Sequence, residues 1–126
     1  MSNSYHNYMS HSDIMECDPI ELFNWIQNNY IDDIPVSLET VDELQAAGNR
    51  LGELTNLYSY FISLVTIANI HLKECKREKK EKEIIDTAMA RRDILQNTVD
   101  VLKMQYTAIS RMITVKKQVD DELKML

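Results

Sequence analysis

The densest group of side chains that could bind a ligand is a run of bases in the middle of the chain. Residues 73–83 (KECKREKKEKE) contain six Lys or Arg and four Glu. Clustered ammonium and guanidinium groups attract phosphates through a field that salt screens, and several copies side by side would attract a polyanion more strongly. The run therefore predicts a phosphate-binding surface made of Lys73, Lys76, Arg77, Lys79, Lys80 and Lys82.

The same run has a second interpretation, in which it is only a solvated helix end. Glu and Lys alternate closely enough to form ion pairs between residues four apart, such as Glu78 with Lys82, each worth a few tenths of a kcal/mol. Few aromatic residues lie nearby, so base-specific readout is not expected. Further bases could extend a phosphate-binding surface: Arg91, Arg92, Lys103, Arg111, Lys116 and Lys117.

Other chemistry has little support in the residue types. The two cysteines, Cys17 and Cys75, cannot form a disulfide scaffold or a four-thiolate zinc site. His6, His11 and His71 lack the spacing of metal ligands. No arrangement of nucleophile, base and acid emerges. We therefore predict a protein that is not an enzyme and that has no cofactor and no metal site.

Charge and composition restrict the fold. Residues 1–56 hold ten acids and one base (net −9), and residues 57–126 hold ten acids and thirteen bases (net +3). The 126 residues include only two Gly and two Pro, which argues against β sandwiches, Rossmann domains and glycine-loop nucleotide binders. No charged-then-apolar leader begins the chain, so an intracellular location is expected.

The bases must be positioned by helices, and the first predicted helix is short. We expect residues 1–17 to be a flexible N-terminal tail. Asp18, Pro19 and Glu21 form a helix start with a capping box. The apolar series Ile20, Phe23, Ile26 and Tyr30 then predicts one amphipathic helix over about residues 18–30.

The rest of the chain, residues 38–126, predicts long helices. Thr40 with Glu43 can form a capping box, and apolar residues then recur every three or four positions from Leu44 to Cys75. A second series at sevens runs from Ala88 to Leu123. We expect an all-α fold, a coiled-coil-like antiparallel hairpin with its turn between residues 78 and 87 and a new helix capped near residues 86–87. The alternative is one continuous helix.

The first long helix is apolar around most of its circumference between residues 54 and 72, more than one partner helix can cover. The remainder must meet the short helix or another copy, so we predict a homo-oligomer. The residues assigned to this core and oligomer interface are Leu57, Tyr58, Phe61, Ile62, Leu64 and Val65. The segment also resembles a membrane span followed by bases, but its Asn and His residues disfavour that alternative.

The long-helix pattern resembles the recombination mediators of tailed phages (UvsY-like proteins). The resemblance covers roughly residues 38–124. It lies in L-x-x-x-Y-x-x-F before a Lys/Arg run, and in L-x(6)-L-K-x-x-Y-x-x-I-x-x-x-I-x-x-x-K in the second helix. The matching positions are Leu54, Tyr58, Phe61, Leu95, Leu102, Lys103, Tyr106, Ile109, Ile113 and Lys117.

The resemblance implies a ring-forming accessory protein in the cytoplasm of a bacterial host, which binds single-stranded DNA and helps to load a RecA-like recombinase. The DNA-binding residues it implies are Lys76, Arg77, Lys79, Lys80 and Lys82. The chain departs from the family in its short C-terminal end and its acidic N-terminal extension. Two alternatives stay open: a helical protein–protein interaction module, and a small acidic phage inhibitor of a host enzyme.

Overall fold

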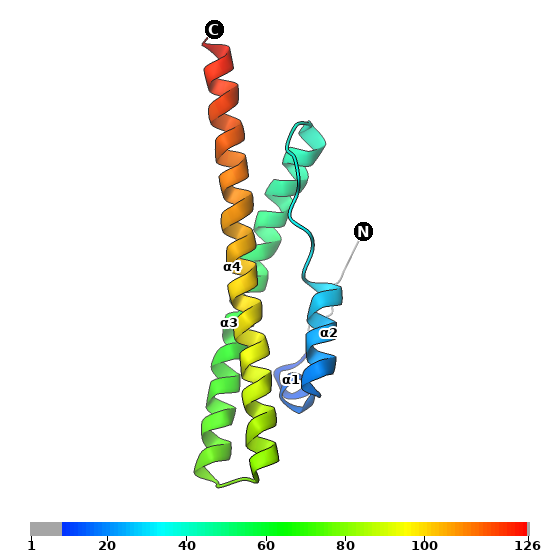
Figure 1. The fold of residues 1–126 in the computed structure, drawn as a ribbon, viewed down its shortest axis with the longest axis vertical. Helices are drawn as coiled ribbons and strands as arrows, with labels where there is room; N and C mark the ends of the chain where they lie inside the picture. Colours follow the sequence, from blue (N-terminus) through cyan, green and yellow to red (C-terminus); the bar gives the residue numbers. More distant parts are fainter. Residues whose placement is uncertain (1–8, 126) are drawn as a thin grey trace.

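The protein is all-α in the computed structural model, which describes residues 9–125. Four helices follow one another in this part of the chain: α1 (His11–Glu16), α2 (Pro19–Asn29), α3 (Val41–Arg77) and α4 (Lys82–Lys124) (Figure 1). α3 and α4 form the long antiparallel hairpin, and the described residues contain no strand. The predicted fold class is confirmed.

The hairpin turn lies at residues 78–81, inside the predicted interval, so the continuous helix is wrong. α4 begins at Lys82, earlier than the predicted cap near residues 86–87. Its N-cap, Glu81, makes no side-chain capping hydrogen bond. α3 passes behind α4 in Figure 1, so the two helices cross along their length.

The start of α3 has the predicted capping box. The Glu43 amide donates to the Thr40 hydroxyl at 3.0 Å, and the Thr40 amide donates to the Glu43 carboxylate at 3.0 Å. The Ser37 hydroxyl also donates to Glu43 at 2.6 Å. This bond, followed by the bond from Thr40, lowers the pKa of Glu43 from its ordinary value. Two donors, the Ser37 hydroxyl and the Thr40 amide, therefore hold the Glu43 carboxylate where the loop enters the helix.

The prediction of a flexible tail over residues 1–17 is wrong for its second part, while residues 1–8 lie outside the described range. Residues 11–16 form α1, whose N-cap Ser10 accepts from the Asp13 amide at 3.1 Å. Ile14 is completely buried. A single turn and a half has too few residues to show a period, and its stability comes from the tertiary contact of Ile14 with the core.

α2 begins at the predicted residues, although only the Asp18 half of the predicted capping box is formed, and it turns a different face to the core. Asp18 accepts from the amides of residues 20 and 21, and Pro19 is the first helical residue. Ile26 and Tyr30 are buried as expected, together with Leu22, whereas Ile20 is 71% exposed and Phe23 48% exposed. The predicted face, with Ile20 and Phe23, and the observed face, with Leu22, both fit a helical period. The packing of α2 on α4 decides which of the two is buried.

One hydrophobic core joins all four helices. Within it the Tyr30 ring meets Phe61 edge-on, with ring centroids 5.6 Å apart, and Trp25 also meets the Tyr30 ring edge-on, with centroids 5.0 Å apart. α1 lies against α3 and α2 against α4, so the N-terminal helices cover the part of the hairpin nearer the turn (Figure 1). The turn and its bases project beyond this core.

Candidate nucleic-acid interface

The turn that presents the bases is a helix C-cap built without glycine. The Lys80 amide donates to the Cys75 carbonyl at 3.0 Å and the Lys79 amide donates to the Lys76 carbonyl at 3.1 Å. These two bonds are those of a Schellman motif, which needs a left-handed residue at its penultimate position. Lys79 fills that position with φ 56°, the only positive φ of a non-glycine residue in the described chain.

The predicted phosphate-binding residues come together at this end of the hairpin. Lys73, Lys76 and Arg77 fall within an arc of about 100° on the last turns of α3, because successive helical residues are rotated by about 100°. The turn adds Lys79 and Lys80, and α4 begins with Lys82. All six side chains are exposed. The structure thus gathers Lys76, Arg77, Lys79, Lys80 and Lys82 into one surface, here called the basic tip.

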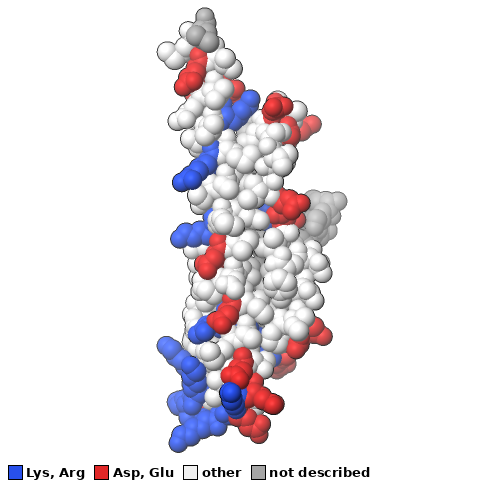
Figure 2. All heavy atoms as spheres, in the orientation of Figure 1, with Lys and Arg blue, Asp and Glu red and all other residues white. Residues whose placement is uncertain are grey.

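Acids and bases separate at the tip. Figure 2 shows Lys and Arg gathered on the side where α3 ends, and Asp and Glu concentrated on the other side. Helix dipoles favour this separation, because cations stabilise the C-terminal end of α3 and anions the N-terminal end of α4. Lys76 and Arg77 lie in the last turn of α3, and Glu83 in the first turn of α4. The result is a surface whose charge is predominantly positive.

Ion pairing at the tip is sparse. Lys80 lies 3.5 Å from the Glu78 carboxylate, and both side chains are about half exposed. Within residues 9–125, no acid lies within ion-pair distance of Lys73, Lys76, Arg77, Lys79 or Lys82. The pair between Glu78 and Lys82, which the ion-paired interpretation expected, is therefore not formed.

The other bases do not simply continue the tip. Arg91 is half-buried and donates to the Cys17 carbonyl at 2.6 Å, which is a structural contact. Arg92 pairs with its neighbour Asp93 at 2.9 Å. Lys116 pairs with Asp120 far along α4. The continuation of the basic surface along α4 is thus weaker than the sequence suggested.

The residues assigned to the core and oligomer interface divide into three groups. Leu57, Phe61 and Leu64 are at most 2% exposed, because the chain's own helices cover them. Tyr58 and Val65 are half-buried against the same core. Ile62 is 41% exposed. Leu57, Phe61 and Leu64 are therefore core residues. They are buried within the single chain, so another copy could not contact them.

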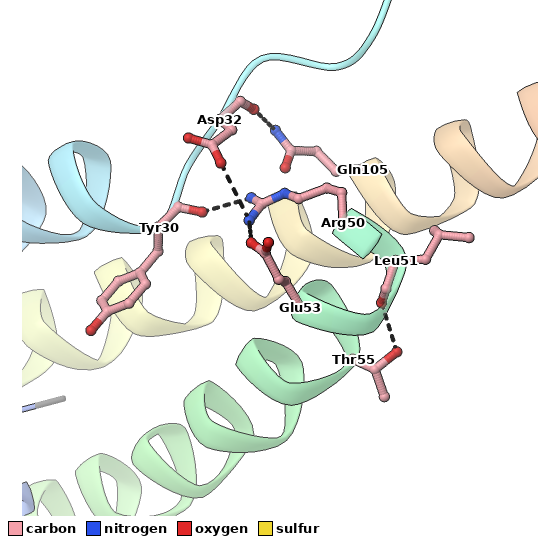
Figure 3. Close-up of polar contacts among 7 residues, drawn as sticks. All are labelled: Tyr30, Asp32, Arg50, Leu51, Glu53, Thr55 and Gln105. Atoms are coloured by element: carbon pink, nitrogen blue, oxygen red, sulfur yellow. Dashed lines mark hydrogen bonds and ion pairs between the residues drawn. The ribbon is translucent and has the colours of Figure 1, made fainter. Parts of the chain in front are cut away.

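Four long side chains of the hairpin hold the N-terminal segment, and the sequence did not reveal this role. Figure 3 shows Arg50, which is 12% exposed, donating to the Tyr30 carbonyl at 2.7 Å and approaching Glu53 and Asp32. Gln105 donates to the Asp32 carbonyl at 2.9 Å.

Tyr60 donates to the Met9 carbonyl at 3.0 Å, and Arg91 completes the set with its bond to Cys17. The isolation of Arg50, the one base among residues 1–56, was the available signal for this role. Nothing in the sequence marked Gln105.

The remaining polar groups offer little reactivity. Burial, and next the Glu21 carboxylate, raise the pKa of the Cys17 thiol, which disfavours its reactive thiolate. Cys75 is buried, with its sulfur 3.7 Å from Nε2 of His71. In residues 9–125, no group of three His, Cys, Asp or Glu side chains is placed to hold a metal ion. Over the same residues, no helix has the length and apolarity needed to cross a membrane.

A search of protein-family models, of curated proteins and of solved structures finds no match to this chain.

Proposed function

We propose that this protein binds single-stranded DNA through its basic tip. The observation that carries the proposal is the cluster of exposed bases at the tip, of which only Lys80 has an acid within ion-pair distance in the described chain. Cations without a fixed partner can neutralise phosphates and release the counterions condensed on the nucleic acid, which is the main source of non-specific affinity. The binding would not depend on base sequence.

A finer part of the proposal concerns the biological role. As the resemblance implies, the protein would act in the cytoplasm of a bacterial host as a phage accessory protein that assists a RecA-like recombinase. The basic tip would hold the DNA strand, and the acidic N-terminal half would face away from that strand. The role is tested by adding the protein to a recombinase on DNA already covered by a strand-binding protein. If the protein does not speed recombinase loading, the accessory role is wrong and only the proposal of DNA binding remains.

Salt dependence tests the phosphate mechanism directly. We expect the affinity for a labelled oligothymidylate, measured by fluorescence anisotropy, to fall linearly in a log–log plot against salt. The slope should be about 0.7 per phosphate contacted, so a tip with five engaged bases gives a slope of about −3 to −4. An affinity that does not change between low and moderate salt would contradict the mechanism.

A pair of matched variants locates the site. Lys76→Glu with Arg77→Glu reverses two charges at the tip, and Lys103→Glu with Lys117→Glu makes the same net change at exposed positions along α4. We expect the tip variant to lose at least tenfold in affinity and to flatten the salt slope, while the control variant stays within a few-fold of the original. Equal losses in both variants would show that only net charge matters.

The protein-interaction module remains a second candidate, favoured by a specific observation. Ile20 and Phe23 lie exposed on the outer face of α2, one turn apart, where they contribute nothing to the core. Such apolar pairs on a helix surface are typical of a docking contact. If this candidate holds, Ile20→Asp with Phe23→Asp abolishes binding to a recombinase or other protein partner and leaves DNA affinity unchanged.

A further inference from the structure

The C-terminal end of α4 carries an apolar row that the described chain leaves uncovered. α4 rises past the start of α3, so its last turns have no neighbouring helix (Figure 1). Val115, Val119 and Leu123 follow one another at intervals of four, and they are 56%, 46% and 62% exposed. Residues four apart share one helix face, so these three side chains form a continuous apolar strip.

A groove extends the strip toward the body of the protein. It lies between the loop at residues 37–39 and α4, and its α4 wall includes Met112, Val115 and Val119. Leu38 lies on the opposite wall and is itself buried. The strip and groove together make an apolar surface on which another helix could pack. The charged residues beside this surface indicate what kind of helix would bind there.

Each flank of the strip carries a base followed by an acid. At about 100° per residue, Lys116 and Asp120 lie on one side of the apolar face, and Arg111 and Glu122 on the other. Within the chain, Lys116 already contacts Asp120 at 3.3 Å, one helical turn away. On both flanks the base precedes the acid along the chain. When a second copy of the helix runs in the opposite direction, each base therefore lies opposite an acid.

A second copy of the chain, running antiparallel, satisfies both flanks at once. A two-fold axis perpendicular to two helices brings like flanks together with their directions reversed. With the axis near residue 118, Lys116 of one copy lies level with Asp120 of the other. Arg111 comes within one turn of Glu122 on the opposite flank. A parallel copy would instead bring Asp120 close to Glu122, two like charges.

We propose that the protein forms a two-fold symmetric, antiparallel dimer through the C-terminal end of α4. Val115, Val119 and Leu123 of the two copies make the seam, and Leu123 of each copy lies at the mouth of the other copy's groove. The overlap from residue 111 to 124 is only about 20 Å long, so the buried area is at the small end for specific interfaces. The dissociation constant is therefore of micromolar order.

The first test is the mass of the full chain by sedimentation equilibrium, over a concentration range that spans micromolar values. We expect it to rise from the chain mass of 14.7 kDa to twice that value. Val115→Asp with Val119→Asp should keep the protein monomeric, with unchanged helicity because both side chains are exposed. Ile20→Asp with Phe23→Asp, an equal change at exposed apolar residues of α2, should dimerise as the original does.

A charge exchange tests the antiparallel geometry itself. Lys116→Asp alone and Asp120→Lys alone each place like charges across the seam, so each variant should dimerise at least tenfold more weakly. Their equimolar mixture should form a heterodimer, and the double exchange Lys116→Asp with Asp120→Lys should recover dimerisation. A wild-type protein that stays at 14.7 kDa, a dimer insensitive to the two Val substitutions, or a mixture that does not associate would each overturn the proposal. None of these results bears on DNA affinity at the tip.

Discussion

Two stretches of α4 each carry an apolar series and meet different surroundings. In the first stretch, Leu95, Leu102 and Ile109 recur at sevens and are at most 1% exposed, packed among α3 and the N-terminal helices. In the second, Val119 and Leu123 continue an apolar face but are about half exposed or more. Periodicity thus identifies a face that needs covering, and the reach of the other elements decides whether the chain covers it.

The covered stretch owes its protection to a segment held by polar contacts as well as by packing. Residues 9–40 run along the hairpin, and the four donors Arg50, Tyr60, Arg91 and Gln105 fix this segment at separated points. No comparable donor reaches across the C-terminal turns of α4 in the described structure. The two stretches therefore differ in free energy of unfolding, in amide exchange and in availability to partners.

The largest effect is expected from deleting an aromatic ring of α3 that packs in the same core as the covered stretch of α4. Phe61→Ala should lower the free energy of unfolding by about 3–5 kcal/mol, because the ring is fully buried between Tyr30 and Tyr60. Val119→Ala, on the exposed strip, should change it by less than about 0.5 kcal/mol at concentrations where the chain is monomeric. Urea unfolding followed by circular dichroism measures both. Equal losses would show that the core around the covered stretch contributes no more to stability than the exposed strip.

A smaller effect is expected from removing a polar contact of the N-terminal segment. Arg50→Met keeps the apolar stem but leaves the Tyr30 carbonyl without this donor, so stability should fall by about 1–3 kcal/mol. Hydrogen exchange should show faster exchange in α2 while α3 near the tip is unchanged. Arg92→Met, whose acid partner is the adjacent Asp93, serves as the control and should have little effect. Unchanged α2 protection in Arg50→Met would show that packing alone holds the segment.

A stabilising substitution is expected at the tip. Lys79→Gly removes the steric penalty of φ 56° and should raise the free energy of unfolding by about 1 kcal/mol. Lys79→Ala removes the same charge without relieving the backbone, so it should be neutral or destabilising. Thermal unfolding of the two variants separates backbone strain from charge. A gain in Lys79→Ala as large as in Lys79→Gly would mean that charge repulsion, and not the left-handed conformation, destabilises the turn.

The smallest effect is expected from acid at the start of α3. The folded pKa of Glu43 lies below its ordinary value, so its capping contribution is present above the unfolded pKa and is lost as pH falls through the folded pKa. Glu43→Gln should flatten this part of the stability profile between neutral and acid pH. Glu39→Gln, an exposed neighbour, should leave the profile unchanged. A profile identical in Glu43→Gln and the original protein would exclude this carboxylate as a source of the pH dependence.

The sequence predicted what depends on neighbouring residues. The caps at Asp18 and Thr40 and the apolar series from Leu54 to Leu72 are local patterns, and the structure contains all three. The basic tip followed from the same logic, since a charged interruption between two apolar series indicates a turn. Its members could therefore be named in advance, although the sequence could not show that, within the described residues, only Lys80 among them has an acid within ion-pair distance.

What the sequence could not supply depends on contacts between distant residues. Ile14 forms part of a helix because a core lies beneath it, and Leu22 rather than Ile20 faces that core because of where α4 lies. Lys79 adopts a left-handed conformation that the chain's other elements impose, where glycine would have been the recognisable signal. Leu57 and Leu64, which were assigned to a core and oligomer interface, lie in the core.

The four contacts that hold the N-terminal segment share one property: each acceptor is a main-chain carbonyl, at Met9, Cys17, Tyr30 and Asp32. Every residue type supplies that acceptor, whereas the donors are particular side chains on the hairpin. These contacts therefore tolerate substitution of the acceptor residues but not of the donor residues. Positions 9 and 17 can vary without losing these bonds, and position 32 can vary without losing its bond from Gln105, although its ion pair with Arg50 needs an acid. Positions 50, 60, 91 and 105 cannot vary in this way, so relatives of this chain would be recognised by the hairpin donors sooner than by the segment they hold.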